Sequence, residues 1–130
     1  MEFQIDPGSR QPIYRQLTRQ ICEAVARGRL LPDQRLPSVR ELSRRLVVNP
    51  NTIARVYTEL EREGVLHTRP GLGVFVAAPR NDLSRKARNE RLAAALNRFL
   101  TEAVHLGFSA NEVVETVQEQ VRQFHWPDDL

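Results

Sequence analysis

The strongest constraint on the fold is a break between two helical patterns within residues 36–76. At residues 47–50, Asn49 precedes Pro50, and a residue before proline disfavours helical geometry. The chain is therefore expected to turn there. A new helix then opens at Pro50, runs to about residue 63 and ends at Gly64.

The helix before the break is expected to begin at Ser38. Ser38 and Glu41 have the spacing of a capping box, in which each side chain binds the other residue's backbone N–H. This helix ends near Val47. Its inner, apolar face consists of Val39, Leu42 and Leu46. The inner face of the following helix consists of Ile53, Val56, Tyr57 and Leu60.

Two runs rich in β-forming residues follow, at residues 65–69 and 74–78. Residues 70–73 separate them, and Gly71 and Gly73 permit a tight tip and close approach of the backbone to a ligand. Two short helices, a tight turn and a hairpin predict a winged helix-turn-helix, a fold that reads DNA. The second of its helices docks with its N-terminal residues at the base edges.

The distribution of charge supports DNA binding and limits which part of the second helix can enter a groove. Residues 1–78 contain 12 Arg and 8 acidic residues, whereas residues 79–130 contain 7 basic and 8 acidic residues. The basic half therefore coincides with the helix-turn-helix pattern, as a phosphate-binding surface requires. The carboxylates of Glu59, Glu61 and Glu63 cannot lie along phosphates, so only the first two turns of that helix can enter a groove.

A supporting helix is expected at residues 12–27, with Gly28 as its C-terminal cap. Its apolar face consists of Ile13, Leu17, Ile21, Ala24 and Val25. Cys22 lies beside this face and is the chain's single cysteine, so we expect a buried thiol rather than a disulfide or a cysteine metal site.

The second half predicts an antiparallel helical hairpin. A long helix follows the linker after Pro79, with Asp82 or Ser84 as its N-cap, and ends before Gly107. A second capping box, Ser109–Glu112, opens the last helix. The fold class is thus mainly α with a small β-hairpin, and the domains are a winged helix-turn-helix at residues 1–78 and a helical domain at residues 79–130.

Both helices of this hairpin have an apolar stripe. The long helix repeats its apolar residues at the spacing of a heptad seam. Two helices alone cannot enclose both stripes, so a second copy of the chain is the expected partner. The residues expected at the dimer contact are Leu92, Leu96, Phe99, Ala103, Leu106, Val117, Val121 and Phe124, with the last three placed on the last helix.

Several segments resemble the GntR family of bacterial transcription regulators. They are LPSVREL at residues 36–42, NPNTI at 49–53, LEREG at 60–64 and TRPGLGVFV at 68–76. The resemblance covers about residues 10–78. The short two-helix second half is similar to the YtrA-type branch of this family.

The resemblance implies a homodimeric repressor on an operator of double-stranded DNA. Family members contact DNA through positions that correspond here to Arg40, Pro50, Asn51, Thr52 and Gly71. Some relatives have Arg where this chain has Pro50, which cannot donate a hydrogen bond. Asn51 and Thr52 therefore gain importance as base contacts.

The residues themselves suggest further contacts. Arg55 lies one turn after the start of its helix, Arg44 one turn after Arg40, and Arg69 beside the wing tip, where a narrow minor groove would attract it. Asn51 and Thr52 are also common helix caps, a role compatible with groove contact. The full set of candidate DNA contacts is Ser38, Arg40, Arg44, Pro50, Asn51, Thr52, Arg55, Arg69 and Gly71.

Other function classes fit less well. A winged helix that binds protein instead of DNA is the alternative, but the arginines around the recognition helix favour DNA. No catalytic set or phosphate loop is present, and the spacing of the three histidines suggests no metal site, so neither an enzyme nor a cofactor is expected. We expect a cytoplasmic protein without a membrane segment. The sequence leaves open a small-molecule effector, the operator and the sign of regulation.

Overall fold

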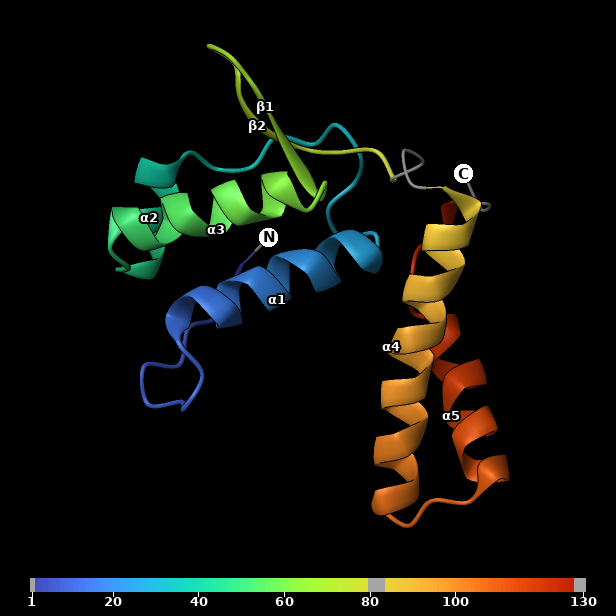
Figure 1. Ribbon diagram of the computed structural model, residues 1–130. Helices are drawn as coiled ribbons and strands as arrows, with labels where there is room; N and C mark the ends of the chain where they lie inside the picture. Colours follow the sequence, from blue (N-terminus) through green and yellow to red (C-terminus); the bar gives the residue numbers. More distant parts are fainter. Residues whose placement is uncertain (1, 80–83, 128–130) are drawn as a thin grey trace. The chain divides into compact units, whose positions relative to one another are not determined.

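The computed structural model describes residues 2–79 and 84–127. They form two compact units (Figure 1). The first contains the described residues of Met1–Pro79 and His125–Leu130, and the second contains those of Arg80–Phe124. The predicted class, mainly α with a small β-hairpin in a winged-helix arrangement, is confirmed.

The first unit contains the helices α1 (Ile13–Ala26), α2 (Val39–Leu46) and α3 (Pro50–Arg62). α3 packs against both α1 and α2, and α1 and α3 begin at the same end of the unit (Figure 1). Its core contains Leu17, Ile21, Leu42, Ile53, Val56, Leu60, Leu66 and Val76, each at most 2 % exposed. Most of these side chains belong to the apolar faces that the sequence predicts.

The wing of the first unit is formed by β1 (Leu66–Arg69) and β2 (Gly73–Val76), which pair in antiparallel register. The loop before α2 adds a third short extended segment along β2. There the Leu36 N–H donates to the Val74 carbonyl at 2.8 Å, and the Val76 N–H donates to the Gln34 carbonyl at 2.9 Å. This third segment is absent from the sequence prediction.

The C-terminal tail also belongs to the first unit. The His125 N–H donates to the Ala26 carbonyl at 2.7 Å. Gly28, at φ 76°, leaves room for the histidine, because a Cβ there would lie 2.9 Å from the His125 Cβ. The end of α1 is therefore covered by residues far away in the sequence.

The second unit consists of α4 (Arg85–His105) and α5 (Ala110–Val121). Ser84 caps α4 by accepting the Ala87 N–H at 3.1 Å, while the alternative cap Asp82 lies outside the described residues. The predicted capping box at Ser109 is present, and its hydrogen bonds lower the pKa of Glu112. Phe124 was expected on the last helix, but α5 ends at Val121 and the chain turns before it reaches Phe124.

Candidate nucleic-acid interface

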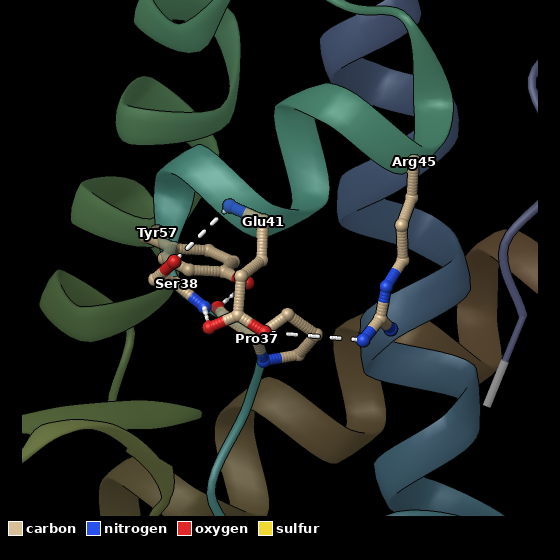
Figure 2. A network of polar contacts seen from close by, with 5 residues as sticks. All are labelled: Pro37, Ser38, Glu41, Arg45 and Tyr57. Atoms are coloured by element: carbon tan, nitrogen blue, oxygen red, sulfur yellow. Dashed lines mark hydrogen bonds and ion pairs between the residues drawn. The ribbon is translucent and has the colours of Figure 1, made fainter.

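A network of polar contacts fixes the start of α2 (Figure 2). The Glu41 N–H donates to Ser38 Oγ at 3.1 Å, and the Ser38 N–H donates to Glu41 Oε1 at 3.4 Å. The Tyr57 hydroxyl of α3 donates to the Pro37 carbonyl at 2.7 Å. Burial, followed by the charge of Glu41, raises the pKa of Tyr57, so this donor keeps its proton at neutral pH. The network sets the orientation of α2 on α3.

Two arginines of α2 project from this fixed start. Arg40 and Arg44 are both exposed and lie four residues apart, so they share a helix face. Arg45 instead reaches back to Glu41, with 3.9 Å between nitrogen and oxygen (Figure 2). Both partners of this pair are more than half exposed, so it contributes little to stability. Arg40 and Arg44 are therefore exposed cations on one face of α2, and Arg45 is an exposed cation that pairs weakly with Glu41.

The tight turn before α3 places the start of the recognition helix. Val47 has a left-handed conformation, with φ 54°, and the Ser43 hydroxyl donates to the Val48 carbonyl at 2.6 Å. Asn49 is the N-cap, since its Oδ1 accepts the Asn51 N–H at 2.8 Å. The sequence interpretation placed the chain break at Asn49 but did not name it as the cap, although an asparagine directly before a proline at the first helical position is a usable signal for a cap.

Because Asn49 is the cap, the side chains of Asn51 and Thr52 lie within the first turn of α3 rather than in the capping position. Asn51 is exposed and Thr52 is half-buried. Pro50 is exposed at the first helical position. The first turn of α3 thus presents an amide and a hydroxyl, which are groups of the kind that proteins use to hydrogen-bond base edges in a major groove.

Arg55, one turn further along α3, leans toward α1. Its Cζ lies 3.9 Å from the centroid of the Tyr14 ring, and its Nε lies 3.6 Å from Glu59 Oε1. Arg55 and Asn51 share a side of α3, as the sequence predicts from their spacing. The contact with Tyr14 ties Arg55 to that flank of the helix.

The acidic end of α3 has structural partners. The carboxylate of Glu61 accepts the Thr68 N–H at 3.0 Å and the Thr68 hydroxyl at 3.1 Å. Glu61 therefore links α3 to β1, and Glu59 pairs with Arg55. Glu61 thus orients the wing and Glu59 orients Arg55. Both carboxylates lie on the part of α3 that was expected to stay out of the DNA groove.

Arg69 is held on the outer face of the wing. Its Nη2 lies 2.7 Å from Asp33 Oδ1, and its Cζ lies 4.3 Å from the centroid of the Phe75 ring. Gly71 is exposed at the wing tip. Arg69 therefore has protein partners near the tip, whereas the sequence offered only a groove contact or a solvated strand end.

Arg35 is a basic residue of the wing that the sequence interpretation missed. It is exposed and lies opposite Phe75 in the third extended segment, on the same face as Arg69. A Cβ on Gly73 would lie 2.9 Å from Arg35 Nε, so the missing side chain of Gly73 lets Arg35 lie over the hairpin. No local pattern reveals this position, because it depends on pairing between distant segments.

The predicted dimer residues lie on the surface of the second unit. Leu92, Leu96, Phe99 and Leu106 are 71 %, 50 %, 42 % and 66 % exposed, and Ala103 is the only buried residue among those described in this unit. Val117 and Val121 of α5 are also exposed, and Phe124 is half-buried. Phe99 and Leu106 line a groove of about 150 Å³ between α4 and α5. The apolar stripes are therefore not covered within the described part of the chain.

Neither a metal site nor a membrane span occurs among the described residues. No three His, Cys, Asp or Glu side chains gather there as metal ligands would. No helix among them has the length and apolarity needed to cross a bilayer. Burial, with smaller effects of Glu63 and Glu23, raises the pKa of Cys22, which disfavours its reactive thiolate.

Comparisons with known proteins agree with this geometry. Residues 13–76 match the model of the bacterial regulatory proteins of the gntR family. The HTH-type transcriptional repressor YtrA of Bacillus subtilis (strain 168) is 34 % identical over 117 residues, which cover 90 % of each chain. A crystal structure of a transcriptional antiterminator from Listeria monocytogenes EGD-e has a TM-score of 0.76 at 33 % identity and covers 93 % of this chain and 90 % of that one.

The matched structures include protein–DNA complexes. The crystal structure of AraR(DBD) in complex with operator ORX1 has a TM-score of 0.53 at 30 % identity. The match covers 59 % of this chain and 99 % of that chain.

Proposed function

The chain belongs to the gntR family of bacterial regulatory proteins, and from this membership we propose that it is a repressor that binds an inverted-repeat operator as a homodimer. The family consists of DNA-binding transcription regulators rather than enzymes. We assign DNA binding to residues 1–78 and dimerisation to residues 79–130. The protein would act in the cytoplasm, where bacterial DNA is found.

The first turn of α3 carries the proposal. Since Asn49 caps the helix, Asn51 is exposed at the position where a recognition helix meets base edges. Asparagine pairs with adenine through two hydrogen bonds, and Thr52 contacts either a base or a thymine methyl group. We propose Asn51 and Thr52 as the base-reading residues, with Pro50 in van der Waals contact.

The remaining candidates surround this turn. Arg40 and Arg44 extend from α2, whose start is fixed by Ser38, and Arg55 extends from the flank of α3. Arg69 and the backbone of Gly71 approach DNA from the wing. We propose that Arg40 contacts a base and so adds to sequence preference, while the others bind the DNA backbone and position the protein on the duplex.

The exposed seam of α4 supports the homodimer. Leu92, Leu96, Phe99 and Leu106 expose an apolar stripe that a second copy would cover. A two-fold dimer presents two α3 helices in opposite directions, so its operator would be an inverted repeat. Repression is proposed because the similar YtrA protein is a repressor and because a dimer on a promoter blocks access to it.

Selection of bound fragments from the source genome tests this function. Purified protein is mixed with sheared genomic DNA at physiological salt, and the retained fragments are sequenced and footprinted. The proposal predicts one enriched motif with two inverted half-sites spaced by about one helical turn, roughly 34–36 Å, or a multiple of it. No enriched motif would favour the protein-interaction alternative.

Variants make the same experiment specific to the proposed surface. Arg40→Ala should lose the enriched motif, whereas Arg62→Ala, at the exposed C-terminal end of α3, should keep it. Equal loss in both variants would mean that the protein binds DNA only through its total charge.

A further inference from the structure

At the start of α1, the ring of Tyr14 contacts two arginines, Arg15 of α1 and Arg55 of α3. Of these three residues, only Arg55 is among the nine candidate DNA contacts. The Cζ atoms of Arg55 and Arg15 lie 3.9 Å and 5.6 Å from the centroid of the Tyr14 ring. Tyr14 is half-buried, whereas both arginines are exposed. The Tyr14 ring therefore contacts the guanidinium of Arg55 from α3 and that of its sequence neighbour Arg15 on α1.

The charge around this cluster favours an anion. The first turns of α1 and α3 contain no acidic residue. Glu59 is the acid that faces Arg55, at 3.6 Å, and the Arg55 side chain is still 57 % exposed in this pair. Two guanidinium groups against one carboxylate leave a positive charge at the surface. Stacking on Tyr14 also holds the Arg55 guanidinium in place before any ligand arrives.

The cluster lies on the flank of the recognition helix. Arg55 and Asn51 share a side of α3, and α1 and α3 begin at the same end of the unit (Figure 1). An α-helix with its side chains is about 10–12 Å wide. The major groove is about 12 Å wide, so a helix that reads its floor brings its flanks to the phosphate strands at the walls.

We propose that Arg15, Tyr14 and Arg55 form a phosphate clamp that grips the DNA strand along the α1 side of the groove. Arg15 and Arg55 bind phosphodiester oxygens, and Tyr14 is a positioning residue that keeps the Arg55 guanidinium on this flank. The clamp rests on the proposed DNA-binding function and adds α1 to the surface that carries it. It contributes affinity for any duplex and little sequence preference.

The test uses the full-length protein and measures operator affinity at several salt concentrations. Each neutralised phosphate contributes about 0.9 to the slope of log affinity against log salt. Arg15→Gln should therefore flatten the slope by about one and weaken specific and non-specific DNA equally. Arg19→Gln, an exposed arginine one turn further along α1, is the matched control and should leave the slope unchanged.

Tyr14 has its own pair of variants. Tyr14→Phe keeps the aromatic face and should retain the wild-type slope, while Tyr14→Leu should flatten it as Arg15→Gln does. A wild-type slope in Arg15→Gln, or equal flattening in Arg15→Gln and Arg19→Gln, would overturn the clamp while the protein still binds its operator. A wild-type protein that binds no duplex would overturn the proposed function as well.

Discussion

Arg69 and Asp33 form an ion pair at 2.7 Å that fixes a basic side chain of the wing. Asp33 has a left-handed backbone with φ 68° and is 75 % exposed in this pair, whereas Arg69 is 38 % exposed because it also covers Phe75. The Asp33 carboxylate is therefore already bound to the Arg69 guanidinium, which was expected to enter a minor groove. A phosphate that approaches the wing competes with Asp33 for Arg69.

This competition predicts opposite effects for the two partners. Arg69→Ala should weaken binding to all duplexes and flatten the salt dependence by about one unit of slope. Asp33→Asn should strengthen binding to all duplexes, because it removes the competing carboxylate, and asparagine tolerates the left-handed backbone. Titration of operator and unrelated DNA at several salt concentrations measures both. A sequence-selective loss in Arg69→Ala, or weaker binding by Asp33→Asn, would contradict this account of the wing.

Arg40 should behave differently from Arg69 if it reads a base. Arg40→Ala should then cost about 1–3 kcal/mol of specific binding, with less effect on unrelated DNA. The operator is affected more than unrelated DNA because a base contact forms only where the operator supplies the matching base. Competition between operator and unrelated duplex measures it, with Arg62→Ala as the exposed control on the same unit. An unchanged operator affinity would reject Arg40 as a contact.

Gly73 should be needed for the packing of Arg35. Gly73→Ala places a Cβ 2.9 Å from Arg35 Nε and strains a backbone at φ 123°, so we expect a loss of roughly 1–3 kcal/mol of unfolding free energy. Denaturant unfolding measures it. In an Arg35→Ala background the loss should be smaller, since the clash is gone and only the backbone strain persists. An equal loss in both backgrounds would show that Arg35 does not lie over Gly73.

The seam of α4 should hold two copies together. Leu96→Glu places a charge in the middle of the apolar stripe, where its burial against a partner is unfavourable. Sedimentation at micromolar concentration should show a dimer for the wild type and a monomer for Leu96→Glu. Arg98→Glu, a charge change on the exposed surface of the same helix, should stay dimeric. A wild-type monomer would remove the proposed basis for an inverted repeat.

The sequence predicts the parts of this fold that depend on local chemistry. The capping boxes at Ser38 and Ser109 and the break before Pro50 all occur where the residue pattern places them. Each depends on residues within a few positions of one another, and side chains at helix ends satisfy the same backbone groups in any context.

The missed features depend on contacts between distant segments. Arg35 lies on the wing because residues 34–36 pair with β2, and His125 covers the end of α1 because Gly28 leaves room for it. Asp33 meets Arg69 across the same pairing. Periodicity cannot reveal such contacts, since each is favourable only once the core has brought the segments together. The cap at Asn49 is different, because a local signal for it exists in the sequence.

The most direct test of the central claim is the base preference of Asn51→Ala. Binding is measured for the wild type and the variant on the operator and on every single base-pair change within one half-site. If the first turn of α3 reads DNA, the variant should lose about 1–3 kcal/mol of discrimination at one position, with an unchanged salt slope. Equal preference at every position in both proteins would contradict the claim, and so would a uniform loss with a flatter salt slope.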